Sequence, residues 1–318
     1  MKSRYIALSE SEPSIPLFSR PWWLDALAGK DAWDVVVVEK GGELHASLPF
    51  VRKKFYGFTV IGQPILTQHL GPWIKPVPGK YATELARQKD LYGELIASLP
   101  GFDRYLQNWA PACDNWLPFF WRGFKQTTRY TYALPDLSDE SALWDGLQQN
   151  IRREIRKAAT RFGIQVRTDL GIADFYALNR LVFERQGMPV PYSLEQLKRL
   201  DDACEQRACR RIFVAQDGEG RSHAAVYLVW DESSAYYLMG GGDPQLRNSG
   251  ATSLCMWEAI RFAASVTKRF DFEGSMLEPV ERFFRGFGAI QAPYFSISKT
   301  PSRLLSAALL LKELKGPA

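Results

Sequence analysis

Residues 236–262 read YYLMGGGDPQLRNSGATSLCMWEAIRF, in which an aromatic strand pattern ends in glycines and a loop leads into a long helix. The start of a helix leaves several backbone N–H groups unpaired, and small residues there let a phosphate approach the backbone. The helix dipole adds on the order of 1 kcal/mol for an anion in a partly buried site. The stretch therefore predicts an α/β junction that binds an anion. The alternative is an ordinary helix capped by Ser249. The predicted binding residues are Arg247, Asn248, Ser249, Gly250, Ala251 and Thr252.

The overall composition is that of a folded protein. The chain has 318 residues, 46% hydrophobic and 24% charged, which is enough for one large or two ordinary domains. Its 19 Phe, 13 Tyr and 10 Trp provide buriable area, and 24 Gly with 19 Pro indicate many turns, so disordered and fibrous classes are excluded. A net charge of +5 permits a phosphate-bearing partner without requiring one.

Several functional classes have little support. No window approaches the roughly 18 uninterrupted apolar residues of a membrane span, and residues 1–10 lack the apolar core of a signal peptide, so we expect a cytoplasmic protein. The 4 cysteines form no CxxC pair and the 3 histidines are widely spaced, so neither a metal site nor a disulfide framework is expected. A Ser/His/Asp hydrolase also lacks support because no GxSxG motif is present.

Two parts of the chain contain similar secondary-structure patterns in the same order. Hairpin patterns occur at 33–51 and 211–230, and Arg-Gly-Phe turns follow at 122–124 and 285–287. We interpret this as a duplicated α/β unit with mixed (α+β) sheets and domains at 1–134 and 135–318, although chance recurrence of hairpins is the alternative. In the second domain we expect helices at 139–162, 172–187, 193–207, 250–265 and 278–286, and strands at 211–216, 223–230, 234–240, 269–273 and 293–298.

The spacing Arg247-x-x-Gly250-x-Thr252 resembles the pyrophosphate-binding loop of the GNAT acyltransferase superfamily. That loop usually has Gln or Arg, two residues, Gly, one residue, and then Gly or Ala, so Thr252 departs from the pattern. The resemblance implies acyl-CoA, for example acetyl-CoA, as the donor co-substrate, with no metal.

Further stretches resemble the Fem-like peptidoglycan-bridge transferases, which consist of two GNAT-type domains. The similar stretches are 21–25, 66–72, 150–163, 183–192, 269–275 and 280–288. In Fem ligases a lysine in the segment corresponding to 283–286 assists aminoacyl transfer from tRNA; here the position falls on Phe284 or Arg285, and a second lysine is replaced around Asp25. These losses disfavour tRNA. The five cations within 152–161 cover either a solvated helix face or a phosphate-binding surface.

The resemblance also implies an acceptor site in a cleft between the domains, near Arg185, Tyr192, Glu273 and Arg285. Arg185 corresponds to an arginine that contacts a substrate phosphate, with an exposed helical arginine as the alternative. Tyr237 lines a pocket or belongs to the core. Glu273 ends the alternating pattern Phe270-Asp271-Phe272-Glu273, where a carboxylate can take a proton from an attacking amine, unless it pairs with Arg269 or Arg285. Direct acyl transfer from a thioester needs mainly orientation, so a dedicated base is not obligatory.

The apolar run at 304–311 is too short to span a membrane. We expect it to pack on the body of the protein or on a second subunit, with peripheral membrane contact through Lys312 and Lys315 as an alternative. The combined expectation is an enzyme that transfers an acyl group from acyl-CoA to an amine of a cell-envelope sugar or peptide precursor. The rivals are an aminoacyl-tRNA-dependent transferase of the same fold and a catalytically inactive binding protein.

Overall fold

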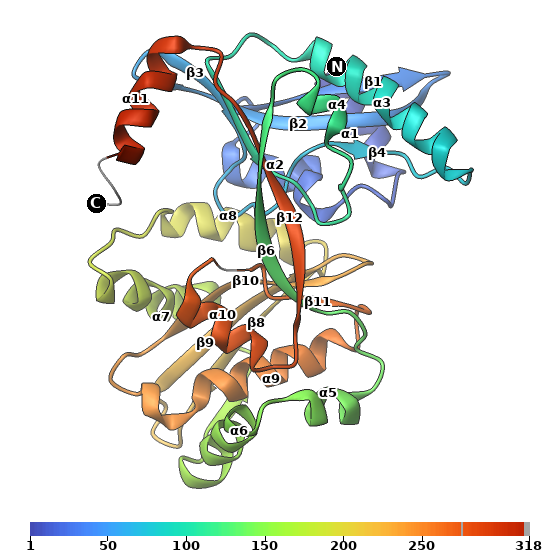
Figure 1. Cartoon of the computed structure of the whole chain (residues 1–318). Coiled ribbons are helices and arrows are strands. Elements are labelled where there is room, and N and C mark those ends of the chain that lie inside the picture. Colours follow the sequence, from blue (N-terminus) through green and yellow to red (C-terminus); the bar gives the residue numbers. More distant parts are fainter. Residues whose placement is uncertain (275, 315–318) are drawn as a thin grey trace. The chain divides into compact units, whose positions relative to one another are not determined.

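The computed structural model describes residues 1–274 and 276–314 and divides into two compact units. Unit 1 comprises Met1–Arg129 and Pro293–Ala318, and unit 2 comprises Tyr130–Ala292. The expected single boundary at 134/135 differs from this division because strands β6 (Lys125–Leu134) and β12 (Ile290–Lys299) each begin in one unit and end in the other (Figure 1). The C-terminal residues therefore belong to unit 1 rather than to the second domain.

Unit 1 is an α/β unit whose strands lie in the order β1-β2-β3-β5-β12, with β4 beside β2. The pairs are antiparallel except for β3 and β5, which are parallel. Its remaining elements are α1 (Lys2–Glu10), η1 (Leu17–Ser19), α2 (Pro21–Ala28), β1 (Trp33–Lys40), β2 (Glu43–Phe55), β3 (Phe58–Gly62), β4 (Trp73–Ile74), α3 (Tyr81–Ser98), β5 (Arg104–Asn108), α4 (Leu117–Phe120) and α11 (Arg303–Leu314).

Unit 2 has its strands in the order β6-β11-β10-β9-β8-β7, in which only β10 and β11 are parallel. The two hairpins predicted at 33–51 and 211–230 are both present, as β1–β2 and β8–β9. The elements of unit 2 are α5 (Glu140–Gly146), α6 (Gln149–Arg161), β7 (Gln165–Arg167), α7 (Ile172–Arg185), α8 (Leu194–Glu205), β8 (Arg210–Gln216), β9 (Ser222–Trp230), β10 (Ala235–Gly242), η2 (Arg247–Ser249), α9 (Ala251–Ala263), β11 (Phe270–Asp271) and α10 (Glu278–Arg285).

Helices cover both faces of the unit 2 sheet. Successive side chains of a strand point to opposite faces, and seven of the nine residues of β9 are buried, which requires cover on both sides. Val226 belongs to the cluster around α9, whereas the ring of its neighbour Tyr227 contacts Phe175 of α7, with centroids 5.5 Å apart. The sheet is thus the middle of three layers, with α9 on one face and α7 on the other.

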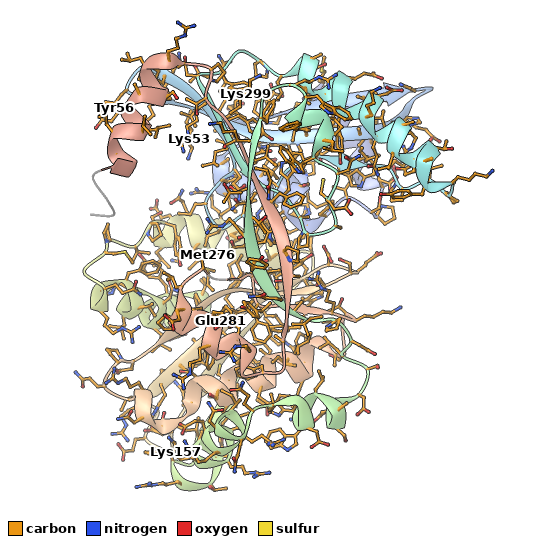
Figure 2. The ribbon with its side chains drawn as sticks, in the orientation of Figure 1. Lys53, Tyr56, Lys157, Met276, Glu281 and Lys299 are labelled. Carbon is orange, nitrogen blue, oxygen red and sulfur yellow. The ribbon has the colours of Figure 1, made fainter. Side chains whose placement is uncertain are left out.

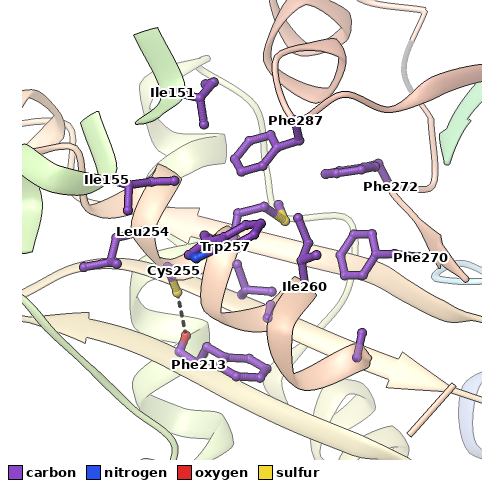
Figure 3. Packing of buried hydrophobic residues seen from close by; sticks show 14 of the residues in the cluster. Ile151, Ile155, Phe213, Leu254, Cys255, Trp257, Ile260, Phe270, Phe272 and Phe287 are labelled. Carbon is purple, nitrogen blue, oxygen red and sulfur yellow. Dashed lines mark hydrogen bonds between the residues drawn. The ribbon is translucent and has the colours of Figure 1, made fainter. Parts of the chain in front are cut away.

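Helix α9 is the centre of the unit 2 core. Nine of its residues are buried, and Trp257 and Ile260 pack with Phe270, Phe272 and Phe287 in one apolar cluster (Figure 3). The Sγ atom of Cys255 donates to the carbonyl oxygen of Phe213 at 3.4 Å, which satisfies a buried thiol. This apolar helix follows the loop that the sequence analysis assigned to anion binding, so the position of that loop is fixed by the core.

Two expected elements of unit 2 differ from the structure. The helix expected at 139–162 is interrupted at Leu147, which has extended backbone and is buried, so α5 and α6 are separate helices. The strand expected at 269–273 contains only Phe270 and Asp271 as β11. The chain leaves the sheet because Glu273 and Gly274 have left-handed φ values of 62° and 61°.

In helix α11, which was expected to pack on the body of the protein or on a second subunit, Leu305 and Leu309 are partly buried. None of its residues with described side chains is buried, and Leu304, Leu310 and Leu311 are among the exposed large hydrophobic residues. Lys315, one of the two flanking lysines, lies outside the described residues. Contact with a second subunit or a membrane therefore stays a prediction.

Candidate functional site

Strands β10 and β11 separate soon after they meet. Their parallel pairing covers only Ala235 with Phe270 and Tyr236 with Asp271. On its other side β10 pairs with β9 through a bulge at Leu238, where the register shifts between Tyr237 and Met239. A bulge re-aims the backbone locally and is often found beside active sites. The last part of β10, Tyr237–Gly242, therefore has no β11 partner within the described residues and carries the predicted pocket residue Tyr237.

Helix α7 packs closely against the end of β10. A Cβ atom at Gly241 would lie 2.6 Å from the backbone nitrogen of Asn179, so only glycine fits there. Asn179 Nδ2 donates to the carbonyl oxygen of Gly240 at 2.7 Å, and the hydroxyl of Tyr192 donates to Asn179 Oδ1 at 2.8 Å. The predicted substrate residue Tyr192 is buried in this chain of bonds, and burial raises the pKa of its hydroxyl to about 12.

Asn179 is a functional candidate that the sequence analysis missed. It is buried on α7 next to Leu178 and four residues after Phe175, so it occupies the apolar face of an otherwise ordinary amphipathic helix. A buried amide needs hydrogen-bond partners. An asparagine on the apolar face of the helix was therefore the sequence signal that could have identified this residue. Asn179 positions the backbone of β10 rather than offering a free group.

Tyr237 lies on the core side of β10. Its ring contacts Phe284 with centroids 5.8 Å apart, and its hydroxyl oxygen would be 1.8 Å from a Cβ atom at Gly240. Burial raises the pKa of Tyr237 above its ordinary value. The contacts of Tyr237 are therefore those expected of a core residue. Because the residue is partly exposed, a role in lining a pocket stays a proposal.

Glu273 is the most unusual side chain in unit 2. Its residue is 4% exposed, its backbone is left-handed, and neither carboxyl oxygen has a hydrogen-bond partner within the described part of the chain. Burial, together with the nearby Asp271 carboxylate, raises the pKa of Glu273 well above its ordinary value, with Arg269 acting in the opposite direction. Such a group binds a proton more firmly than an exposed carboxylate does.

The two arginines expected to pair with Glu273 are engaged elsewhere. Arg269 Nη2 forms an ion pair with Asp271 Oδ2 at 3.0 Å, and the hydroxyl of Thr131 also donates to Asp271. The backbone N–H of Glu273 donates to Asp271 Oδ1 at 2.9 Å. Both carboxyl oxygens of Asp271 thus have partners. The alternative in which Glu273 forms an ion pair with Arg269 is wrong.

The same holds for Arg285, whose Nε atom forms an ion pair with Glu281 at 2.8 Å. Glu281, labelled in Figure 2, also accepts a hydrogen bond of 2.9 Å from the hydroxyl of Tyr132. The neighbouring Phe284 is buried against Phe272, with ring centroids 5.0 Å apart. Of the two positions where the resemblance puts the missing lysine, Arg285 is the exposed one.

Arg185 is exposed as the last residue of α7. Among the described residues it makes no hydrogen bond or ion pair with Tyr192, Tyr237, Glu273 or Arg285, so its role in substrate binding stays a prediction. Tyr192, Tyr237 and Gly240 are connected with one another through the packing of α7 on β10. The structure therefore brings part of the expected acceptor site together.

The predicted anion loop has an exposed part and a buried part. Arg247, Asn248 and Thr252 are exposed, whereas Ser249, Gly250 and Ala251 are buried. Gly250 has a left-handed φ of 82°, and a Cβ atom there would lie 2.3 Å from the carbonyl oxygen of Glu154 on α6. Glycine is required at this position by the packing of α6, so the close approach of a phosphate is not the reason for it.

A chain of side-chain bonds holds the buried part of the loop. Ser249 Oγ accepts from the backbone nitrogen of Ala251 at 3.3 Å and lies 3.0 Å from His223 Nδ1, although the residue at the N-cap position of α9 is Gly250. His223 Nε2 lies 3.0 Å from Asp217 Oδ2, and this bond holds the pKa of Asp217 well below its usual range. The order of groups is that of a Ser/His/Asp triad, but Ser249 is 3% exposed. The chain ties the β8–β9 turn to the start of α9 and offers no accessible nucleophile.

A basic groove lies along α6, beside the predicted loop. Its volume is about 970 Å³, and its lining residues are Trp144, Asp145, Gln149, Asn150, Arg152, Arg153, Arg156, Lys157 and Arg161. The Arg156 guanidinium lies 5.5 Å from the centre of the Trp144 ring, and Lys157, labelled in Figure 2, pairs with Glu154. On α6 itself Ile151, Ile155 and Ala158 are buried, so the cations face away from the core. The groove offers several positive charges to a polyanion.

One carboxylate cluster in the described residues has the arrangement of a cation site, namely Asp201, Asp202 and Glu205. Asp201 forms an ion pair of 2.9 Å with Arg210 and accepts 2.8 Å from the hydroxyl of Tyr227. Its charge is therefore already used in joining α8 to the sheet. The contacts of Asp201 with Arg210 and Tyr227 therefore give this cluster a structural role.

The comparisons with known proteins concern the fold and the domain family. Residues 146–284 match the family described as an acetyltransferase (GNAT) domain. No curated protein sequence matches the chain. Among solved structures, FemX has a TM-score of 0.64 at 13% identity, covering 93% of this chain and 95% of its own. The C-terminal domain of a lysylphosphatidylglycerol synthetase from Agrobacterium fabrum has a TM-score of 0.56 at 11% identity, covering 97% and 94%.

A third similar structure is a tandem GNAT protein from the clavulanic acid biosynthesis pathway, with a TM-score of 0.51 at 12% identity, covering 94% of this chain and 95% of its own. These identities are low, so the structures establish the fold. The residues that match the GNAT acetyltransferase domain lie within unit 2, and this match supports a transferase. By fold, the whole chain is similar to FemX and to the tandem GNAT protein.

The search for membrane spans concerns the described residues alone. None of the helices there combines the length and the apolar character that crossing a bilayer demands.

Proposed function

We propose that this protein transfers an acyl group from an acyl-CoA thioester, such as acetyl-CoA, to an amine of a cell-envelope sugar or peptide precursor. The observation that carries the proposal is Glu273, a buried carboxyl group without a partner among the described residues, next to the place where β10 and β11 separate. An unpaired buried acid costs stability, because desolvation is not repaid by a hydrogen bond. Costly groups of this kind are frequent at functional sites.

Glu273 suits an acceptor that arrives as an ammonium ion. The approaching positive charge favours the ionised carboxyl, so Glu273 releases its proton to water and forms an ion pair. Its raised pKa makes the carboxylate a good proton acceptor, and it then takes one proton from the ammonium. The neutral amine attacks the thioester carbonyl and the C–N bond forms. The C–S bond then breaks, and the departing sulfur takes the proton that the nitrogen loses, so that coenzyme A leaves as the thiol.

The exposed part of the loop supplies the proposed donor contacts. Arg247 and Asn248 have no hydrogen-bond or ion-pair partner within the described residues, and both precede α9 with Thr252 in its first turn. A guanidinium near a helix start is suited to a diphosphate. Ser249, Gly250 and Ala251 position these groups through buried packing. Since acyl-CoA is a cytoplasmic metabolite, we place the reaction in the cytoplasm.

The acceptor class is proposed from the neighbours of the fold. One of the similar structures is named as a lysylphosphatidylglycerol synthetase and another as FemX. Arg185 and Arg285 are the exposed cations that we assign to an anionic acceptor group, with Tyr192 and Tyr237 shaping the site through their packing. The acceptor is then an amine attached to a phosphate- or carboxylate-bearing precursor.

The test measures free thiol released from acetyl-CoA in the presence of a panel of amino sugars and short peptides. Glu273→Gln should lower turnover by about 10²- to 10⁴-fold, the usual contribution of a positioned proton acceptor. Glu278→Gln, an exposed carboxyl group on α10, is the matched control and should leave turnover unchanged. Equal activity of the Glu273→Gln variant and the parent would refute the assigned role. Acetyl-CoA binding without thiol release for any amine would support the binding-protein alternative.

A second candidate donor is an aminoacyl-tRNA, which the basic groove along α6 favours. Binding through several phosphates weakens steeply as salt rises, and each lost phosphate contact lowers the slope of log affinity against log salt by about 1. The Arg153→Ala and Arg156→Ala variants should show this change for tRNA if the groove holds the donor. Unchanged tRNA affinity in both variants leaves acyl-CoA as the donor.

A further inference from the structure

The hairpin β2–β3 of unit 1 extends beyond its neighbouring strands: β1 ends opposite Val51, and the pairing of β5 with β3 ends at Val60, followed by one bond from the backbone N–H of Asp103 to the carbonyl oxygen of Thr59. Its partner β1 begins at Trp33, which pairs with Val51, so residues 52–55 of β2 pair with β3 alone. The four residues from Arg52 to Phe55 are all exposed, whereas most of the preceding part of β2 is buried. The arm therefore contributes little to the core, and its side chains are available to a partner.

The tip of this arm carries two exposed aromatic rings. Phe55 is 61% exposed and Tyr56 is 89% exposed, and their rings contact edge to face with centroids 4.6 Å apart. Figure 2 labels Tyr56 in the turn and Lys53 on β2. Folding alone would favour polar residues here, since exposed aromatic rings gain nothing from the core.

Tyr56 is also unfavourable for the backbone. Phe55 pairs with Phe58, so Tyr56 and Gly57 form a two-residue turn with φ values of 47° and 82°. Turns with both central φ values positive prefer Asn or Asp followed by Gly, and a large aromatic residue in the first position is strained. A bulky ring kept at a strained, exposed position indicates a role in binding.

Three cations follow the aromatic tip along the strand, namely Arg52, Lys53 and Lys54. Because side chains alternate along a strand, Arg52 and Lys54 lie on one face of the arm and Lys53 on the other. None of the three has an ion-pair partner within the described residues. The arm thus ends in aromatic rings and carries positive charge on both faces behind them.

We infer that this arm inserts its aromatic tip into the interface of an anionic lipid surface. Aromatic rings favour the headgroup level of a bilayer, and lysine and arginine near the surface are attracted by anionic lipids. An arm that enters a lipid surface end on is surrounded by headgroups, so positive charge on both of its faces is useful. A nucleic acid or protein would lie against one face of the arm and would use the charge on that face alone. Unit 1 also carries helix α11, which has exposed leucines together with Arg303 and Lys312. Exposed apolar side chains next to cations are likewise suited to an anionic lipid surface.

The inference does not depend on the proposed acyl transfer. Its test is co-sedimentation of the full-length protein with vesicles of phosphatidylcholine, either alone or with about one third phosphatidylglycerol. Binding is expected only to the anionic vesicles and should weaken as salt rises. Absence of binding to phosphatidylglycerol vesicles at low salt would overturn the inference.

Two variants locate the contact. Lys53→Glu with Lys54→Glu should lower the partition coefficient by roughly thirtyfold or more, from about 1 kcal/mol per cation. Tyr56→Gly removes the ring and relieves the positive φ, so the protein should fold at least as well while partitioning falls by about tenfold or more.

The matched controls lie elsewhere on unit 1. Lys80→Glu with Lys89→Glu makes the same change in net charge at exposed positions, and Tyr81→Ala removes another exposed aromatic ring. Both should leave vesicle binding within about twofold of the parent. Equal losses in the controls and the tip variants would overturn the inference. So would a loss of RNA binding in the tip variants with unchanged vesicle binding, which would make the arm a nucleic-acid surface.

Discussion

At the scale of single residues, Glu273 combines three unfavourable features. Its carboxyl group is buried, it has no hydrogen-bond partner in the described residues, and its backbone is left-handed. Its main-chain N–H donates to Asp271, whose own charge is neutralised by Arg269. Asp271 therefore holds the backbone in place while the side chain of Glu273 stays available for a substrate.

The raised pKa of Glu273 makes stability depend on pH. Between the ordinary glutamate pKa, about 4.3, and the raised native value, the folded protein keeps a proton that the unfolded chain has lost. The free energy of unfolding therefore falls by about 1.4 kcal/mol per pH unit in that window through this residue, and the effect is absent below it. Glu273→Gln should remove this fall.

Urea unfolding of the parent and the Glu273→Gln variant at a series of pH values checks this. The variant should gain stability relative to the parent as pH rises above about 5, with a constant difference below about pH 4. Glu278→Gln is the exposed control. A difference between parent and Glu273→Gln that does not change with pH would show that Glu273 titrates normally.

The sequence indicated Glu273 as a candidate but not its environment. Alternation along a strand placed it on a sheet face, whereas the structure ends β11 at Asp271 and turns the chain through two left-handed residues. Short strands of this kind have no periodic signal, because their extent depends on neighbours distant in sequence. At Gly274, a Cβ atom would lie 2.4 Å from the carbonyl oxygen of Tyr130, a contact that no local pattern reveals.

At the scale of elements, the start of α9 is held by α6 on one side and by the β8–β9 turn on the other. Glu154 of α6 contacts Gly250, and Ser249 reaches Asp217 through His223. The strand, loop and helix were all predictable from glycine content and apolar periodicity. The role of Gly250 was not, since it comes from packing between two helices nearly a hundred residues apart in sequence.

Gly250→Ala should destabilise the protein by about 2–4 kcal/mol, because the added Cβ atom meets a backbone carbonyl and the left-handed φ is unfavourable for alanine. Gly218→Ala, in the same unit with open space around its Cβ position, should change stability by less than about 0.5 kcal/mol. Chemical denaturation followed by circular dichroism measures both. A cost for Gly250→Ala as small as that of the control would mean that α6 does not constrain the loop.

At the scale of the whole molecule, the two units differ in how their residues are distributed along the chain. The unit 2 core is built entirely from residues between 132 and 289. The unit 1 core includes Ile297, and β5 pairs with β12 through residues 296–299. The sequence predicted two similar units, but strand exchange at the C-terminus depends on tertiary pairing that local patterns do not record.

Fragments of the chain should therefore behave differently. Residues 130–292 retain a complete core and should unfold cooperatively on heating. Residues 1–134 lack the strand that covers β5 and should be unfolded or aggregated. Thermal unfolding followed by circular dichroism distinguishes the two fragments, and a cooperatively folded 1–134 fragment would contradict this division of the chain.

The most direct test of the acyl-CoA proposal is calorimetric titration of the purified protein with acetyl-CoA at two salt concentrations. The proposal predicts micromolar binding that changes little with salt, because a short ligand held at the start of α9 involves few phosphates. Arg247→Ala should weaken that binding while leaving the thermal unfolding of the protein unchanged. Absence of acetyl-CoA binding by the folded parent protein would contradict the proposed donor, and unchanged affinity in Arg247→Ala would contradict its assigned loop.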